Sequence, residues 1–599
     1  MARRAGTAAR GPAAPGPAAG RRARSRRRIS TAALAAIAVA ISATLMITLS
    51  AQAIVAHASC TNHPVLLNVA VTNDLAPAVE RVAQAFNRQE HTAAGRCAQV
   101  QVTEDPSATV ASRIDGQSSS RGMPPVDAWI PDSSLWVDVA RSFPRGAQLV
   151  QPTALDVAQS PLMIVMPQLV ARETHAFSSP AGWNVLLPPA DGGPPASLGL
   201  RVDLPDPTDS AAGLATLVEL SRMLGPGAAA RATFTKFVLS SEATSQFDNP
   251  ASLASFVSTA GPPFSSRPVT VTSEQAVIGY DRANPSQPLA AQYPAAFQAS
   301  LSSPDLDYPY VLTSSSPAEI QAAKEFKQAL RQPYAASVVR YYGFRSADGT
   351  VAATPASFGL RSQVLQRAAS ASASEAQTTL EVWGKLGLGS RDLVLIDVSA
   401  AMAQLDGNGQ QTLEQELTRT ATLGLALFPD STQMGEWQVA NHVSGDMPYQ
   451  RLVTVGPLPA AVGLISRRQQ LQQIDETLHP LGSKLALNSA ILAAYKQMLA
   501  SYKPNYSNSV IVLTSGVDNA AGDMSVSSLL TQLHALFNPN RKVAIVILML
   551  GTVGNFSAMQ QVAAATGGAA FDITNPTQVA KAFIEGFSRR LCDPHCAAP

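Results

Sequence analysis

The stretch LVLIDVSAAM, residues 393–402, decides the fold of the C-terminal part of the chain. Four apolar residues lead directly into Asp397, and Ser399 follows two positions later. A short apolar run that ends in polar residues is typical of a parallel strand buried on both faces. Ligands of open parallel sheets lie at the carboxyl ends of the strands, so Asp397 and Ser399 are candidate binding residues. The alternative is that Asp397 caps the turn or helix that follows.

Five segments, in order, resemble the von Willebrand factor A (VWA) domain family. The first is its D-x-S-x-S motif, here DVSAA at 397–401, with Ala401 in place of the last serine. The others are MGEWQ at 434–438, LGSKL at 481–485, VIVLTSG at 510–516 and TGG at 566–568. The resemblance implies a doubly wound, Rossmann-like α/β domain, which we place at residues 391–590. The predicted alternation of strands and helices agrees with this fold class. The strands are expected at 437–440, 452–455, 509–513 and 543–549, and the helices at 411–427, 462–478, 485–499 and 578–587.

The VWA resemblance also implies a divalent-cation site that a partner protein completes with its own carboxylate. The matching positions are Asp397, Ser399, Ala401, Ser483 and Ser515. Ala401 has no side-chain oxygen, and Ser515 stands where the family has a second aspartate, so one carboxylate is left for a doubly charged ion. We therefore predict that the metal positions Asp397, Ser399, Ser483 and Ser515 bind Mg²⁺ or Ca²⁺ weakly or not at all. Asp518 is the best candidate for a substitute ligand, and we expect no other cofactor.

The first 55 residues predict a membrane anchor. Residues 1–28 hold nine arginines and no acid, and their composition predicts a disordered cytoplasmic tail. Residues 29–55 carry no charge and exceed the ~20 apolar residues that a membrane span needs. The positive-inside rule then places the N-terminus in the cytoplasm and the rest of the chain on the extracellular side of the cell membrane. The alternatives are a signal peptide cleaved after Ala51-Gln52-Ala53 and a lipoprotein anchored at Cys60.

Residues 61–360 are predicted to form an α/β domain with parallel strands. A strand at 65–71, a helix at 75–87 and strands at 97–102 and 126–130 follow one another. The segments DAWIPDS (127–133), SPLMIV (160–165), LPDPT (204–208), SEQA (273–276), DYPY (307–310) and GFR (343–345) resemble bacterial extracellular solute-binding proteins of the two-lobed type II class.

That resemblance implies that the chain crosses twice between two lobes and that a solute binds in the cleft between them. The run at 162–165 is a candidate crossing strand, and the segments 205–210 and 273–275 are candidates to face the cleft. The alternative for Asp206, Thr208, Asp209 and Ser210 is that they cap a helix beginning near Ala211. Trp129 and Trp136 are read as packing residues rather than as ligand platforms.

The remaining boundaries follow from composition. The low-complexity run ASASAS at 369–374 predicts a linker at residues 361–390. The four cysteines, Cys60, Cys97, Cys592 and Cys596, lie at the edges of the folded region, and residues 591–599 are a tail. An even, sparse count in an exported chain predicts two disulfides. We favour Cys60–Cys97 and Cys592–Cys596 among the three pairings, and half a metal site at 592–596 is the alternative.

The sequence predicts a binding protein and not an enzyme. At 599 residues the chain exceeds a single domain, and its net charge of +2 hides the local basic block, so we expect no nucleic-acid partner. It contains no G-x-S-x-G, H-E-x-x-H or P-loop pattern. The whole resembles a bacterial, actinobacterial-type membrane-anchored protein that binds an unknown small solute and an unknown extracellular protein. The alternatives are an envelope scaffold and a transporter-associated receptor.

Overall fold

The computed structural model describes most of residues 64–591. It leaves out 90, 117–122, 178–181, 189–198, 245–246, 261–266, 295–301, 304, 352–365, 368–370, 406–408, 552–553 and 575–576. The predicted tail 1–28, the predicted membrane span 29–55 and residues 592–599 therefore lie outside the described residues. Among the helices that are described, none combines the length and the apolar character that crossing a bilayer requires.

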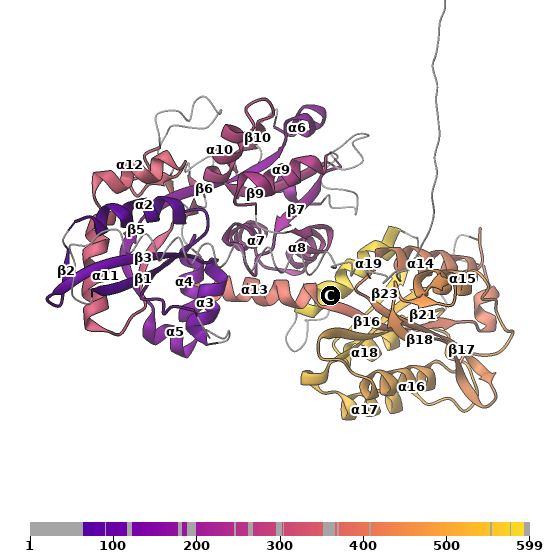
Figure 1. The fold of residues 1–599 in the computed structure, drawn as a ribbon. Helices are drawn as coiled ribbons and strands as arrows, with labels where there is room; N and C mark the ends of the chain where they lie inside the picture. The colour runs from indigo at the N-terminus through magenta and orange to yellow at the C-terminus, as the bar shows by residue number, and fades with distance from the viewer. Residues whose placement is uncertain are drawn as a thin grey trace, which may run out of the picture. The chain divides into compact units, whose positions relative to one another are not determined.

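The chain begins with a sheet of six strands in the order β2-β3-β1-β4-β13-β5 (Figure 1). Its members are β1 (Val65–Val71), β2 (Thr92–Ala93), β3 (Arg96–Glu104), β4 (Ala128–Ile130), β5 (Gln151–Asp156) and β13 (Pro309–Leu312). β1 pairs in parallel with β3 and β4. The helix α2 (Ala76–Asn87) connects β1 to the β2–β3 hairpin and buries Val79, Val82 and Phe86. The strand predicted at 65–71 and the helix predicted at 75–87 are confirmed.

A second sheet follows, in the strand order β10-β6-β9-β7-β8. Its strands are β6 (Ala158–Pro167), β7 (Arg201–Pro205), β8 (Glu242–Thr244), β9 (Pro268–Ser273) and β10 (Leu289–Gln292). The helices after these strands are α7 (Ala211–Leu224), α8 (Ala228–Ser240), α9 (Pro250–Ser258) and α10 (Glu274–Ala283). β7 is parallel to β8 and β9, whereas β6 is antiparallel to β9 and β10. The sheet is therefore mixed, and the first domain has two lobes.

The chain passes between the two sheets at Val157, where β5 of the first sheet runs into β6 of the second. It returns at residues 307–308, between β12 (Asp305–Leu306), which pairs with β6, and β13. The Val157 amide donates to the Tyr308 carbonyl (3.0 Å), so the two passages are joined. The run at 162–165, predicted as a crossing strand, is fully buried in β6, the strand that the chain enters at this passage, and the passage itself lies five residues before the run.

A third passage leads from α12 (Pro333–Tyr341), which packs on α2, to β14 (Arg345–Ser346), which pairs with β6. Two passages were expected, and the part of the chain that the structure describes contains three. The third is fixed by Arg345, whose guanidinium lies 2.8 Å from the Glu274 carboxylate of α10, both side chains being about 1% exposed. Tyr293 donates its hydroxyl to the same carboxylate (2.5 Å).

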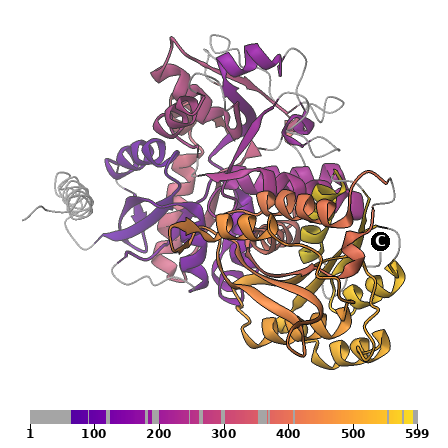
Figure 2. The ribbon, with the colours of Figure 1, turned by 90° about the vertical axis from the view of Figure 1, so that its right-hand side faces the viewer.

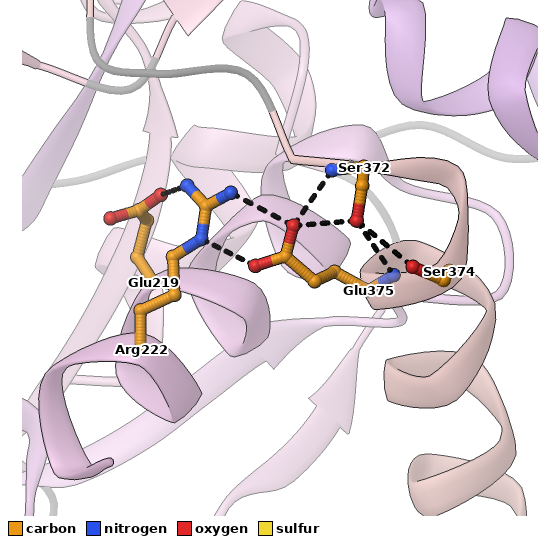
Figure 3. Close-up of polar contacts among 5 residues, drawn as sticks. All are labelled: Glu219, Arg222, Ser372, Ser374 and Glu375. Carbon is orange, nitrogen blue, oxygen red and sulfur yellow. Dashed lines mark hydrogen bonds and ion pairs between the residues drawn. The ribbon is translucent and has the colours of Figure 1, made fainter.

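The predicted linker 361–390 contains a helix, α13 (Ala373–Gly387), which packs against α4 (Ser134–Arg141), α7 and α8. Its first turn has a capping box, because Ser372 accepts from the Glu375 amide while Glu375 accepts from the Ser372 amide. Glu375 also receives two hydrogen bonds from Arg222 of α7 (2.9 and 3.1 Å), as Figure 3 shows. The Arg222 guanidinium, together with the capping bonds, lowers the pKa of Glu375 to about 2. One residue separates α13 from the next strand, so this segment is an ordered helical connection.

The second domain is built on a sheet in the order β18-β17-β16-β21-β22-β23. The strands are β16 (Gly389–Asp397), β17 (Gln433–Ser444), β18 (Met447–Pro457), β21 (Tyr506–Thr514), β22 (Val543–Leu550) and β23 (Ala569–Ile573). All neighbours pair in parallel except β17 and β18. β16 begins two residues before the predicted start of the domain at Arg391.

Helices cover both faces of this sheet, as Figure 1 shows and Figure 2 shows again from the side. Leu393 and Leu395 of β16 pack with α16 (Leu487–Ala500), α17 (Val526–Leu536) and α18 (Phe556–Ala564). Val394 and Ile396 face the other helices, α14 (Leu413–Leu427), α15 (Arg467–Asp475) and α19 (Thr577–Ser588). Burial on both faces explains the unbroken apolar run of β16, and the α/β class predicted for this region is confirmed.

Cys97 lies on β3 and is disulfide-bonded. The other three cysteines, Cys60, Cys592 and Cys596, lie outside the described residues, so both pairings remain predictions.

Candidate functional site

Loops from both lobes of the first domain meet at a small cavity of about 20 Å³. Most of the loops follow the carboxyl ends of strands, where open α/β sheets bind ligands. A cavity of this volume holds about one water molecule. In this conformation the cavity is therefore too small for a solute. The lining residues are Thr72, Asp74, Asp132, Pro205, Ser210, Ala212, Phe247, Asp248, Val271, Thr272, Ser273 and Leu306.

Three carboxyl groups dominate this cavity, and none of the described lining residues is a lysine or arginine. Burial raises the pKa of Asp74 to about 7 and that of Asp132 to about 6. Burial also raises the pKa of Asp248, and the charge of Asp248 raises the pKa of both other groups. The Oδ1 atoms of Asp74 and Asp132 are buried without a hydrogen-bond partner. The cavity therefore presents carboxyl oxygen atoms to which the described residues donate no hydrogen bond.

Tyr308 links this cavity to the passages between the lobes. It is fully buried, has a positive φ of 40°, and donates its hydroxyl to Asp74 (2.5 Å). A non-glycine residue held in the left-handed region is strained, and such strain persists where the surroundings fix it. Movement of the lobes about residues 307–308 would therefore change the position of the Asp74 carboxylate.

The sequence predicted part of this cleft. Ser210 and Ser273 line it, and each also caps a helix, accepting from the amides of Gly213 (3.3 Å) and Ala276 (3.2 Å). Both interpretations of the segment 205–210 thus hold for Ser210, while Asp206 closes its own turn by accepting from Thr208. Trp129 and Trp136 are buried in the core, as predicted. Asp74 was missed, although its place directly after β1 satisfies the same carboxyl-end rule that identified Asp397.

At the carboxyl end of the second domain's sheet, Asp397 is almost fully buried and accepts four hydrogen bonds. Its Oδ1 accepts from the Ser399 amide (2.9 Å), and its Oδ2 from the Thr514 hydroxyl (3.0 Å) and from the amide and hydroxyl of Ser515 (3.0 and 2.9 Å). Ser483 joins this group through its carbonyl, which accepts from the Ala400 amide (2.7 Å). The four predicted positions are therefore brought to one edge of the sheet.

The residues at this edge fit a divalent cation poorly. Both oxygens of the one carboxylate are used in hydrogen bonds, and Ala401 supplies no oxygen. The hydroxyls of Ser399 and Ser483 are buried without a partner, but they are neutral. Across the described residues, no group of three or more acidic, histidine or cysteine side chains could hold a metal ion. What the residues do support is the capping interpretation, since Asp397 accepts from the Ser399 amide in the turn that follows β16, and its other bonds tie β16 to the loop after β21.

Asp518, the predicted substitute ligand, is bound to the amino end of α16. Its carboxylate accepts from the Leu487 amide (3.2 Å) and from the Asn488 side chain (2.6 Å). Asp523 accepts from the Asn488 amide beside it (3.0 Å). Burial and the charge of Asp523 raise the pKa of Asp518 to about 7. A carboxylate at a helix amino end is stabilised by the free amides and the helix dipole, so Asp518 has a structural role.

The first domain therefore has two lobes, joined by passages of the chain, with an acidic cleft where their loops meet. In agreement, residues 67–345 match the family of bacterial extracellular solute-binding proteins. This match spans less than half of the chain and covers the first domain. No curated protein sequence is significantly similar to the chain.

Solved structures similar to the chain include iron-bound HitA from Pseudomonas aeruginosa, with 14% identity and a TM-score of 0.40 over 54% of this chain and 100% of that chain. The sulfate-binding protein SubI from Mycobacterium tuberculosis has 17% identity and a TM-score of 0.34 over 50% and 94%. A von Willebrand factor type A structure from Catenulispora acidiphila has 15% identity and a TM-score of 0.25 over 34% and 43%. Because each TM-score is below 0.5, the function proposed next rests on the residues of this chain.

Proposed function

We propose that the first domain binds a small, positively charged solute in the cleft between its lobes. The observation that carries this proposal is the cluster of Asp74, Asp132 and Asp248, which face the cavity with no lysine or arginine among the described lining residues. A buried carboxylate is costly unless it is paired. A cationic solute would supply the missing charge, whereas an anion such as sulfate would be repelled.

A thermal-shift screen of the full chain tests this proposal, with small organic amines, divalent metal ions, sulfate and phosphate as separate arms. A solute that binds only the folded state stabilises it by RT ln(1 + [L]/Kd), so Tm rises with the logarithm of the solute concentration once that concentration exceeds Kd. We expect shifts from cations that grow between pH 5 and pH 8, because the cleft acids ionise in that interval. The Asp132→Asn variant should lose the shift, and Asp446→Asn, on an exposed hairpin of the second domain, should keep it. Shifts from the anions alone would contradict the proposal.

We propose further that the second domain is a VWA domain that contacts a protein partner without a metal ion. The parallel sheet with one antiparallel edge, the DVS motif at the end of β16 and the TGG segment before β23 support this proposal. Binding of the partner should be insensitive to chelators. A pull-down from envelope extracts, repeated with EDTA, provides the measurement.

For the location, we propose that residues 29–55 anchor the chain in the cell membrane with both domains outside the cytoplasm. The nine arginines before an uncharged segment support this orientation. Protease added to intact cells should digest residues 64–591. Digestion only after lysis would show that the orientation is reversed.

A further inference from the structure

A cavity of about 420 Å³ runs along one face of the second domain's sheet, and Asp397 is not among the residues that line it. It is bounded by one face of β16, β21 and β22 and by the helices α14 and α19. Protein interiors are packed nearly as densely as organic crystals and leave few voids larger than a water molecule. Cavities of ~300–1,000 Å³ are instead typical of small-molecule sites.

Most of the cavity wall is apolar. The sheet contributes alternate side chains of its strands, and the helices contribute aliphatic and aromatic side chains. The apolar lining includes Val394, Ile396, Leu425, Phe428, Ile511, Leu513, Val546, Leu548, Val579, Phe583 and Phe587. Such a wall favours the hydrocarbon part of a ligand over water, since an apolar cavity gives water no hydrogen-bond partners.

Two helical glycines border this space, Gly424 of α14 and Gly586 of α19. A Cβ atom added at either position would meet nothing within 4 Å. Glycine inside a helix destabilises it by roughly 0.5–1 kcal/mol relative to alanine. Larger residues would fit at both positions but would extend into open space, so the glycines keep the cavity wide.

One end of the cavity is strongly basic. Lys385, Lys542, Arg589 and Arg590 line it, with Asp392 as the acid beside them. Arg590 donates to the Leu388 carbonyl (3.0 Å) and lies 3.7 Å from the centre of the Phe587 ring. Burial lowers its pKa to about 10, and burial also lowers the pKa of Arg589. The Nε atom of Arg589 is buried without a partner among the described residues.

The other carboxyl groups of the cavity do not neutralise this basic end. Glu436 and Asp475 are paired with each other, and burial raises the pKa of Asp475 to about 7 and that of Glu436 well above its usual value. The Asp392 carboxylate accepts from the Ser390 and Ser509 hydroxyls and also attracts the Arg590 guanidinium, while Glu585 attracts the guanidinium of Arg589. Four cationic side chains, Lys385, Lys542, Arg589 and Arg590, therefore line this end of the cavity with one carboxylate, Asp392.

We infer that this cavity binds an amphiphile with a single acyl chain and an anionic head group, such as a long-chain carboxylate. The chain would lie between the sheet and α14 and α19, and the head group would meet Arg589 and Arg590. This site is independent of the solute cleft and of the carboxyl edge, so its test does not depend on either proposal above.

The test measures binding of radiolabelled dodecanoate to the full chain in lipid nanodiscs, with empty nanodiscs subtracted. Dodecyltrimethylammonium, which has the same tail and a cationic head, is the first competitor, and a lysophospholipid is the second. We expect dodecanoate to bind and the ammonium compound to compete about tenfold less well or worse, because a charge-assisted hydrogen bond to the head group contributes ~1.5–3 kcal/mol. Stronger competition by the lysophospholipid would identify a lipid head group as the source of the anion.

The variants Gly586→Leu and Gly424→Leu should fold, because both positions are open, and should reduce dodecanoate binding by about tenfold or more by filling the cavity. The matched control is Gly384→Leu in α13, since a Cβ there also meets nothing and the residue does not line the cavity. Arg590→Gln should weaken dodecanoate binding without affecting the ammonium compound. Equal binding by wild type and both filling variants, with unchanged Tm, would overturn the inference, as would equal affinity for the two head groups.

Discussion

The two domains place acidic side chains at the same position of an α/β sheet and use them differently. In the first domain, Asp74 and Asp132 follow parallel strands, keep unpaired buried oxygens and have raised pKa values. In the second domain, Asp397 follows a parallel strand and accepts four hydrogen bonds. The difference teaches that position at a sheet edge identifies a candidate site, whereas the hydrogen bonds already made decide whether the carboxylate is available to a ligand.

The largest effect on stability is expected from removing the Asp397 carboxylate, which accepts four hydrogen bonds at the edge of the second domain's sheet. Asp397→Ala leaves the Thr514 hydroxyl, the Ser515 amide and hydroxyl and the Ser399 amide without their acceptor. Each unsatisfied buried group costs ~1–3 kcal/mol, so we expect a loss of about 4 kcal/mol in the free energy of unfolding. Urea denaturation of the full chain measures it. Asp397→Asn keeps one acceptor oxygen and should lose less. Equal stability of wild type and Asp397→Ala would contradict the structural role.

The second largest effect is expected at the Asp132 carboxyl group of the cleft, whose Oδ1 atom has no hydrogen-bond partner among the described residues. The raised pKa of Asp132 means that the folded state holds a proton that the unfolded state releases, so stability without solute falls as pH rises from about 4 to about 6. Asp132→Asn removes this penalty, and we expect it to stabilise the solute-free protein by about 2 kcal/mol at pH 8 and very little at pH 4. Denaturation at both pH values checks this. A destabilised variant at pH 8 would show that Asp132 is already paired.

The resemblance of five ordered segments to the VWA family identified Asp397, Ser399, Ser483 and Ser515 as neighbours. It could not identify how their hydrogen bonds are shared, since that depends on how closely the loop after β21 approaches β16. Asp248 was missed for the same reason: it enters the cleft only because β8 pairs with β7, a contact made by segments 37 residues apart at their closest.

Short sequence signals for a helix cap and for two turns were also overlooked. The ASASAS run predicted a linker, yet Ser372 and Glu375 have the S-x-x-E spacing of a capping box and begin α13. The helix predicted at 462–478 begins only at Arg467, because Gly463 has φ 66° and forms the turn of the β19–β20 hairpin (Ala461–Val462 and Ile465–Ser466). The strands predicted at 437–440 and 452–455 extend toward each other as β17 and β18, and only a tight turn at Gly445, where φ is 62°, separates them.

A smaller effect is expected when the carboxyl edge of the second domain's sheet is given the residues that the VWA family has at its cation site. The double variant Ala401→Ser, Ser515→Asp restores the serine and the second carboxylate. Two carboxylates side by side repel each other without a cation, so the variant should be less stable than wild type in EDTA and regain stability in Mg²⁺. Isothermal titration should show at least about tenfold tighter Mg²⁺ binding than wild type. Adding Asp397→Asn should abolish the gain. Micromolar affinity in the wild-type protein would show that the present residues already form a metal site.

The smallest effect concerns the helix that leads from one domain into the other. Arg222 contacts both Glu219 and Glu375, and Glu375 combines this ion pair with the cap of α13 (Figure 3). The Glu375 side chain is 41% exposed, and solvent screening limits such a pair to ~0.5–1 kcal/mol. A double-mutant cycle with Arg222→Gln and Glu375→Gln isolates this pair from the cap, because only the second variant disturbs Ser372. Since the low pKa of Glu375 keeps it ionised above pH 4, the coupling free energy should be constant from pH 5 to pH 8 and fall in 1 M salt. A coupling free energy of zero at low salt would mean that α13 is held on α7 by its buried face alone, with Ala376 and Leu386 in the core of the first domain.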